Sequence, residues 1–200
     1  GSDNSVHDQI LSCQLQNKSD MGQVKFYRMS SNPAYHYEYR YELNERNLRL
    51  NESRLILLLT GKGHACVDWW EFSTGATLLS YMRLSGFSIL AICKLKKTYE
   101  ISNPIQKNRD AYYIYKTLQI WINHIYYSKF HHYPRLYLLG ISWGTKMCSL
   151  LCRVLPVQAQ VYYIATGDPA SLLIHSDFET AMQNRLIADY RFANWFYFNY

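Results

Sequence analysis

Hydrophobic and polar residues recur along the chain with two different periods, which predict strands in some segments and helices in others. In Tyr35–Leu43, tyrosines occupy every second position, so they lie on one face of an expected strand. Over Arg109–Tyr127 the apolar residues follow helical spacing instead, which predicts the longest helix of the chain. Two short apolar runs, LILLL and SILAI, have the length of strands that are buried on both faces.

Strands and helices follow one another in alternation from residue 54 onward. The expected elements are, in order, strand 54–60, helix 74–86 closed by Gly86, strand 87–95, helix 109–127, strand 135–141, a helix that Pro156 ends, and strand 160–166. This order predicts an α/β fold with a mostly parallel central sheet and helices on both faces, preceded by an N-terminal antiparallel strand or hairpin. In sheets of this kind, ligands bind beyond the carboxyl ends of the strands.

The length of 200 residues and a hydrophobic fraction of 48% suit one domain. Residues 3–23 are polar and without a clear period, so we expect residues 1–23 to form a flexible arm that begins with the cloning remnant Gly1-Ser2. We expect residues 24–200 to form the single domain. The chain ends in the aromatic run NWFYFNY, which leaves open that this domain is incomplete at its C-terminus and belongs to a larger enzyme.

The composition argues against several classes of protein. No apolar run approaches the length of a membrane-spanning helix. The five cysteines are odd in number and lack the Cys-x-x-Cys spacing of zinc sites, which favours a reducing compartment. Cys148 and Cys152, one helical turn apart, are expected to be buried core thiols. We therefore expect a cytoplasmic protein that uses neither a metal nor a cofactor.

The chain carries a net charge of +6, which can attract anionic lipid, nucleic acid or an acidic partner. Its densest basic run, Lys94, Lys96 and Lys97, follows an expected strand and is not interleaved with aromatic residues on a helix. We therefore expect a solvated loop there and no nucleic-acid partner. A protein partner or an anionic membrane surface stays open.

Gly140, Ser142 and Gly144 form a Gly-x-Ser-x-Gly motif between the strand LYLLG and a helix that begins near Thr145. In a sharp strand-to-helix turn, the residues two before and two after the apex nearly touch, so both are small, and the apex side chain projects into the cleft. The start of the helix favours negative charge beside Ser142, and the Trp143 N–H can donate to an oxyanion. The motif therefore predicts a nucleophilic serine.

Four segments resemble the α/β-hydrolase superfamily in order and spacing: LILLLTGKGH, SGFSILAI, LYLLGISWG and VYYIATGDPA, which together span about residues 54–170. The resemblance implies a serine hydrolase of esterase or lipase type that acts on a small-molecule or lipid ester or thioester, with Ser142 as the nucleophile. It also implies an oxyanion hole built from the Trp143 N–H and from the loop after LILLLT. That loop does not keep the superfamily's usual His-Gly order, so its donor is placed at Gly63, His64 or Ala65.

The resemblance places the acid of a catalytic triad at Asp168, because residues 167–170 are similar to the Gly-x-Asp-Pro-Ala stretch of some lipases, with one residue missing. An ordinary Asp-Pro turn explains the same residues. A serine needs a base to take its proton, and His175 is the sole histidine after Asp168. We therefore expect the triad Ser142, Asp168 and His175, with His64 or a histidine beyond the end of this sequence as the alternative base.

Two functions other than hydrolysis are also compared with the sequence pattern. A hydrolase-like scaffold that has lost turnover would serve as a protein or membrane interaction domain, and this alternative stays open. Dinucleotide binding is disfavoured, because Gly61 and Gly63 begin a Gly-x-Gly-x-x-Gly pattern whose third glycine is replaced by Cys66. In addition, no acidic residue ends the next expected strand to hold a ribose.

Overall fold

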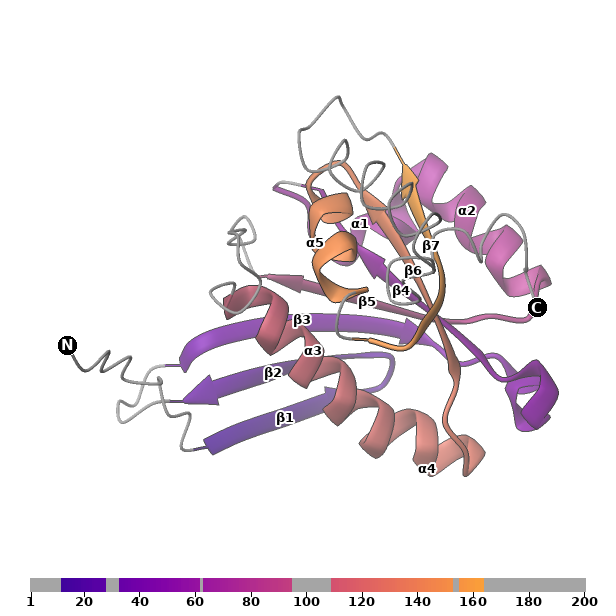
Figure 1. Cartoon of the computed structure of the whole chain (residues 1–200), viewed down its shortest axis with the longest axis horizontal. Helices are drawn as coiled ribbons and strands as arrows, with labels where there is room; N and C mark the ends of the chain where they lie inside the picture. The colour runs from indigo at the N-terminus through magenta and orange to yellow at the C-terminus, as the bar shows by residue number, and fades with distance from the viewer. Residues whose placement is uncertain (1–11, 28–32, 62, 95–108, 153–154, 164–200) are drawn as a thin grey trace, which may run out of the picture.

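The structure, a computed structural model, describes residues 12–27, 33–61, 63–94, 109–152 and 155–163, which form a seven-stranded sheet with helices on both faces (Figure 1). The strands are β1 (Ser12–Lys18), β2 (Met21–Tyr27), β3 (Pro33–Glu42), β4 (Arg54–Leu59), β5 (Ser88–Lys94), β6 (Arg135–Ile141) and β7 (Val157–Tyr163). The α-helices are α1 (Asp68–Glu71), α2 (Ser73–Leu84), α3 (Arg109–Trp121), α4 (Tyr127–Phe130) and α5 (Trp143–Leu151). Short 3₁₀ helices η1 (Glu45–Leu48) and η2 (Leu50–Glu52) and a π-helical turn η4 (Ile122–Tyr126) complete the described elements. Among the described helices, none has both the length and the apolar character needed to cross a lipid bilayer.

The strand order across the sheet is β1-β2-β3-β5-β4-β6-β7. β5, β4, β6 and β7 run parallel, whereas β1, β2 and β3 pair antiparallel with one another and β3 pairs antiparallel with β5. The α/β fold with a mostly parallel sheet and an N-terminal antiparallel hairpin, predicted from the sequence, is confirmed. Leu59, the last residue of β4, pairs with Gly140 near the end of β6, so the loops after these two strands leave from the same edge of the sheet. Ligand sites of this fold class lie at that edge.

The segment expected to be a flexible arm is partly built into the sheet. Residues 12–23 contain β1 and the start of β2, so the predicted boundary before Val24 is wrong for this part; the rest of the arm lies outside the described residues. β1 is a polar and mostly exposed edge strand, which leaves no apolar period to find in the sequence. It is held by its ladder with β2 and by the Tyr39 hydroxyl of β3, which donates to Asn17 Oδ1 at 2.9 Å.

The alternating tyrosines of β3 confirm the strand predicted for them. Tyr35, Tyr37, Tyr39 and Tyr41 are all buried, whereas the residues between them are partly exposed. The rings pack against α3, where Tyr35 stacks on Tyr113 with the ring centroids 4.0 Å apart. The row of tyrosines is therefore a core surface, as expected from the number of aromatic residues in the chain.

A buried ion pair links the end of β5 to the start of α3. Asp110 is fully buried, and its carboxylate accepts hydrogen bonds from the Tyr37 hydroxyl and from the Lys94 ammonium, the latter at 2.8 Å. The expected solvated loop at Lys94 is therefore wrong for this residue, which neutralises a carboxylate that would be costly to bury alone. Lys96 and Lys97 lie outside the described residues.

The side chains of β4 divide the core between the two faces of the sheet. Leu55, Leu57 and Leu59 pack in the cluster that contains α3 and α5, whereas Ile56 and Leu58 pack in the cluster that contains α1 and α2. Each of the five is at most 3% exposed. Full burial of one such side chain contributes about 1.5–3 kcal/mol to the free energy of folding. Burial on both faces explains why this strand is an uninterrupted apolar run in the sequence.

The helix predicted over 109–127 is interrupted by the π-helical turn η4, which follows α3 and precedes α4. A π turn holds one residue more than expected for an α-helix, so the residues after it are rotated about the helix axis. Tyr126 ends this turn fully buried, with its hydroxyl 2.7 Å from Ser53 Oγ and donating to Asn47 Oδ1 at 2.8 Å. His131 then closes the helix in the left-handed region, with φ 59°.

A disulfide joins Cys66, in the loop after β4, to Cys93 in β5. The two cysteines are 27 positions apart, and no short spacing marks the pair in the sequence. Disulfides persist mainly in oxidising compartments, so the bond argues against the reducing compartment inferred from the odd cysteine count, and the expected cytoplasmic localisation loses that support. Cys148 and Cys152 are buried in the core, as expected, and Cys13 is exposed.

The Cys93→Ser variant is expected to have a free energy of unfolding about 3 kcal/mol lower than the parent protein, because the unfolded chain loses a cross-link that restricts it. Chemical denaturation of oxidised protein measures the difference. Cys13→Ser removes an exposed free thiol and serves as the control, with an unchanged denaturation midpoint. Equal stability of Cys93→Ser and the parent protein would contradict the disulfide.

Candidate active site

Ser142 lies at the apex of the turn between β6 and α5, in an unusual backbone conformation. Its φ is 51° and its ψ is −113°, a combination outside the regions that residues other than glycine normally occupy. Strain of this kind costs about 1–3 kcal/mol and persists only where the surroundings impose it. Here the Ser142 carbonyl accepts two hydrogen bonds from the first turn of α5, from the Thr145 N–H at 3.0 Å and from the Thr145 hydroxyl at 2.7 Å. The helix therefore holds the serine in its strained conformation.

The two glycines that flank the serine are required because neither position has room for a side chain. A Cβ on Gly140 would lie 2.5 Å from the Gly144 carbonyl oxygen and 2.8 Å from Cys148 Sγ. A Cβ on Gly144 would lie 2.2 Å from the carbonyl oxygen of Leu59. The first turn of α5 is thus in contact with both its own preceding strand and the carboxyl end of β4, in agreement with the steric argument made from the sequence.

Cys148 lies directly beneath this turn and is fully buried. Burial raises the pKa of the Cys148 thiol well above its ordinary value, and the neighbouring Cys152 thiol raises it further. A thiol with a raised pKa stays protonated, and a protonated thiol is a weak nucleophile. Cys148 therefore packs beneath the elbow and does not compete with Ser142.

The start of α5 gives the site a positive electrostatic character. Trp143 is the first residue of α5, and the N-terminal end of a helix carries a partial positive charge. The Lys146 ammonium lies 3.8 Å from the centre of the Trp143 ring, a cation–π contact that keeps a full positive charge on the first turn. The partial charge at the helix start favours an anion beside Ser142.

The loop after β4 approaches the serine from the neighbouring strand. A Cβ on Gly61 would lie 3.5 Å from Ser142 Cβ and 3.6 Å from His64 Cδ2, so both side chains lie close to Gly61. His64 Nδ1 lies 3.0 Å from Asp68 Oδ2, and the same carboxylate oxygen accepts a hydrogen bond from the Ala65 N–H at 3.0 Å. The structure thus brings together Ser142, the histidine that the sequence placed in this loop, and a carboxylate.

The three candidates for the second oxyanion donor differ in what their N–H groups already bind. The His64 N–H donates to the Gly61 carbonyl at 3.4 Å, and the Ala65 N–H donates to a carboxylate at 3.0 Å. Gly63 has φ 77°, which favours glycine, and its N–H makes no hydrogen bond to the described part of the chain. The His64 N–H is therefore disfavoured as the second oxyanion donor, and the Gly63 N–H remains the candidate for this role.

A pocket of about 370 Å³ opens between the loop after β4 and the end of β6. A volume of this size suits a small-molecule ligand. The lining combines aromatic, small and polar side chains: Thr60, Gly61, His64, Asp68, Trp69, Phe72, Thr74, Gly75 and Ile141. Because Ile141 immediately precedes Ser142, this pocket adjoins the proposed nucleophile.

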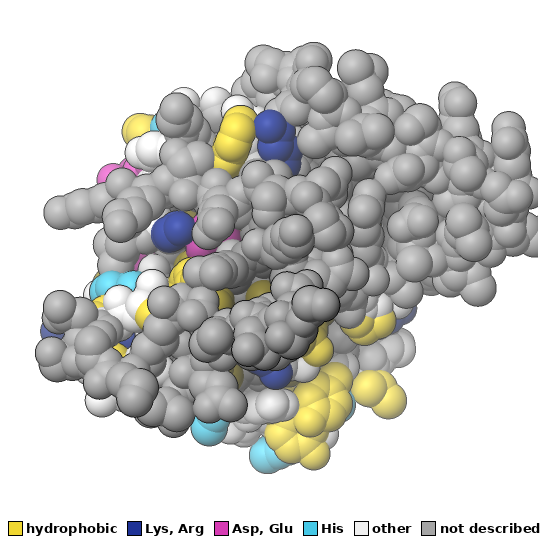
Figure 2. Space-filling model, turned by 60° about the vertical axis from the view of Figure 1, so that its left-hand side comes forward, with side chains coloured by type: hydrophobic (Ala, Val, Ile, Leu, Met, Phe, Trp, Pro, Cys, Tyr) yellow, Lys and Arg dark blue, Asp and Glu magenta, His cyan; other side chains and the backbone are white. Residues whose placement is uncertain are grey.

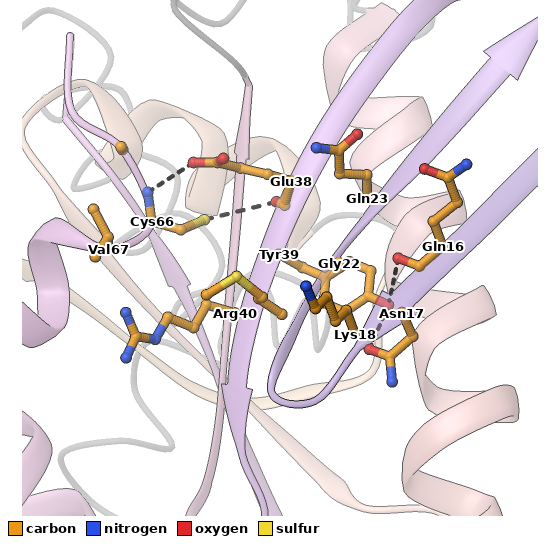
Figure 3. Close-up of a pocket in the computed structure, with 12 residues that line it drawn as sticks. Gln16, Asn17, Lys18, Gly22, Gln23, Glu38, Tyr39, Arg40, Cys66 and Val67 are labelled. Atoms are coloured by element: carbon orange, nitrogen blue, oxygen red, sulfur yellow. Dashed lines mark hydrogen bonds between the residues drawn. The ribbon is translucent and has the colours of Figure 1, made fainter.

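A second pocket, of about 440 Å³, is lined by residues 65–67 of the same loop and by residues of β1, β2 and β3 (Figure 3). There Glu38 Oε1 accepts a hydrogen bond from the Cys66 N–H at 3.1 Å (Figure 3). Glu38, Cys66 and Cys93 are close enough to share a metal ion, but both sulfurs are joined in the disulfide, which leaves no thiolate to bind one. These contacts instead fasten the loop that carries His64 to β3 and β5.

Basic side chains are not gathered into one patch on the face that Figure 2 shows. There the described Lys and Arg side chains stand at separate positions, between hydrophobic and histidine side chains (Figure 2). A protein partner or an anionic membrane surface therefore remains a prediction from the net charge of +6.

Two predicted catalytic residues, Asp168 and His175, lie outside the described residues, so their places in the triad remain predictions. Asp68 was not predicted as a site residue. Its signal in the sequence is the His-x-x-x-Asp spacing of His64 and Asp68, since residues four apart are neighbours on one side of a helical turn.

No protein-family model and no curated protein matches the sequence. Among solved structures, the chain is similar to a thermostable carboxyl esterase from Bacillus coagulans, with a TM-score of 0.49 and 13% identity, over 84% of this chain and 52% of that one. It is also similar to alpha/beta hydrolase domain-containing protein 10 from mouse (TM-score 0.44, 12% identity, 82% of this chain and 54% of that one). A third structure is an α/β serine hydrolase without a lid from Xanthomonas campestris (TM-score 0.45, 9% identity, 73% of this chain and 62% of that one). The chain thus spans little more than half of the length of the first two, and the last two bear the name of the superfamily that the sequence resembles.

The Gly144→Ala variant is expected to lose about 3 kcal/mol of stability, because the added methyl group meets backbone oxygens that cannot move aside. Chemical denaturation measures the loss. Gly61→Ala is the matched control: its methyl group would make only contacts of 3.4–3.6 Å, so its stability should stay within about 1 kcal/mol of the parent protein. Equal stability of the two variants would show that α5 does not approach β4 as described.

Proposed function

We propose that this chain is a serine hydrolase of esterase or lipase type, which cleaves ester or thioester bonds with Ser142 as its nucleophile. The observation that carries the proposal is the elbow itself: a serine at φ 51° between two glycines that have no room for a side chain. A strand can pass into a helix without any of these constraints. Their combined effect is to present one hydroxyl at the carboxyl end of a central strand, where ligands bind in this class of fold.

In the proposed reaction, Ser142 Oγ attacks the carbonyl carbon of the substrate while a base takes the hydroxyl proton. The substrate oxygen becomes an oxyanion, which accepts hydrogen bonds from the Trp143 and Gly63 N–H groups and is stabilised by the partial positive charge at the start of α5. The alcohol or thiol then leaves with the proton. Water repeats the attack on the acyl-enzyme and releases the acid. The sequence resemblance assigns the base and the acid of this scheme to His175 and Asp168.

The pocket beside Ser142 favours a small ester or thioester. Its volume of about 370 Å³ and its two aromatic side chains, Trp69 and Phe72, suit a short acyl or alkyl group. Thr60 and Thr74 add hydroxyl groups to the same lining. The proposed steps use no metal and no cofactor, since the serine, its base and the oxyanion donors supply the chemistry.

A fluorophosphonate probe, which bonds covalently to activated serines, is expected to label Ser142. Mass spectrometry of the labelled peptide identifies the residue. The label should be lost in Ser142→Ala, and hydrolysis of p-nitrophenyl acetate should fall by at least about a hundredfold in the same variant. The control is Ser80→Ala, which removes an exposed serine of α2 and should label like the parent protein.

The outcome against the proposal is equally clear. Absence of labelling in protein that still shows a cooperative thermal transition would sink the serine hydrolase and would leave the interaction scaffold as the function to pursue.

A further inference from the structure

The His64–Asp68 pair beside Ser142 has the arrangement that a catalytic base requires. The His64 Nδ1 is 3.0 Å from Asp68 Oδ2, so an ionised Asp68 fixes the proton on Nδ1 and leaves the lone pair on Nε2. The Cδ2 atom, which neighbours Nε2 in the ring, is the atom that approaches Gly61, and Ser142 Cβ meets Gly61 at a similar distance. The Cδ2–Nε2 edge of the imidazole therefore lies near Gly61, the residue that Ser142 also approaches.

The loop holds this pair in place through contacts on every side. The Ala65 N–H donates to the same Asp68 oxygen as His64, at 3.0 Å. The next residue, Cys66, is bonded to β5 through the disulfide and to Glu38 of β3 through its N–H (Figure 3). Trp69, directly after Asp68, is 3% exposed in the core. A base that is fixed before substrate binds loses little freedom in the reaction, which favours catalysis.

Phe72 fixes the ring plane of His64 from the pocket side. The two rings meet edge to face, with their centroids 5.8 Å apart and their planes at 89°. The His64 side chain is nevertheless 51% exposed, so solvent and substrate can reach it. The imidazole is thus contacted by both Asp68 and Phe72, and about half of its surface stays accessible.

We propose that His64 is the general base that activates Ser142 and that Asp68 is the positioning residue that orients it. This inference rests on the proposed serine hydrolase and replaces only the base and acid that the sequence resemblance assigned. Nε2 takes the Oγ proton as the Oγ–carbon bond forms, and Asp68 stabilises the imidazolium. The same proton then passes to the leaving alcohol or thiol as the bond to the carbonyl carbon breaks. Water is activated by the same nitrogen in the second half of the reaction.

A purely structural role makes a different prediction. If the pair only closes the first turn of α1, its loss changes the stability of the loop and leaves the reactivity of Ser142 unchanged. The rate constant for fluorophosphonate labelling of Ser142 separates the two roles, because it reports the activation of the serine directly.

The experiment compares labelling rates in the full chain for His64→Ala, His64→Gln, Asp68→Asn and His175→Ala, with His124→Ala as the control at an exposed histidine of η4. We expect His64→Ala and His64→Gln to label at least about a hundredfold more slowly than the parent protein, and added imidazole to restore part of the rate in His64→Ala. Asp68→Asn should also slow labelling. In the His64→Ala background it should cause no further decrease in the labelling rate, since the two residues act as a unit. Thermal melting shows that each variant is folded.

The possible failures are distinguishable. If His64→Ala labels at the parental rate while His175→Ala is slow and is restored by imidazole, the inference is overturned and the serine hydrolase stands with His175 as its base. If Asp68→Asn slows labelling equally with and without His64, Asp68 does not act through the histidine and the positioning role is overturned. If the folded parent protein does not label at Ser142, the proposed function fails and this inference fails with it.

Discussion

The close approach of α5 to the carboxyl end of β4 is the constraint on which the candidate site depends. A Cβ on Gly144 would clash with the Leu59 carbonyl. A Cβ on Gly140, in the strand that precedes the helix, would clash with the Gly144 carbonyl. A helix that lies this close can follow β6 only through a very tight turn. The turn forces Ser142 to φ 51°, and the two hydrogen bonds from Thr145 to its carbonyl hold it there. The strain is thus a consequence of packing, and its effect is to present the hydroxyl at the edge of the sheet.

The same strand end also supports the loop that faces the serine. Because β4 and β6 are parallel neighbours in register, their loops leave the sheet side by side, which is why Gly61 lies close to Ser142. An exposed loop would ordinarily be mobile. Here two residues fix it: Cys66, through the disulfide and the hydrogen bond from its N–H to Glu38, and Trp69, through its burial in the core. A rigid elbow and a tethered loop therefore face each other across one pocket.

The features that could be predicted from the sequence are those with a local physical cause. An apolar run predicts a strand buried on both faces, and the glycine spacing around Ser142 predicts a turn without room for side chains. Other features depend on partners that are distant in the sequence. The polar strand β1 is held by its pairing with β2, the disulfide of Cys66 joins residues 27 positions apart, and Lys94 is paired with Asp110 only because α3 begins beside β5. Asp68 had a local signal, but its spacing from His64 is equally typical of an ordinary helical turn.

The position of the catalytic base in the chain decides how much of the site the sheet positions. A base in a distant downstream segment would reach the serine through a connection whose geometry is independent of β4 and β6. A base at His64 is instead only a few residues beyond Leu59, and Gly144 packs against that same residue. The nucleophile and the base would then be positioned by one strand end, which is among the most deeply buried parts of the core. In that arrangement the register of β4 against β6 sets the separation of the two proposed catalytic groups.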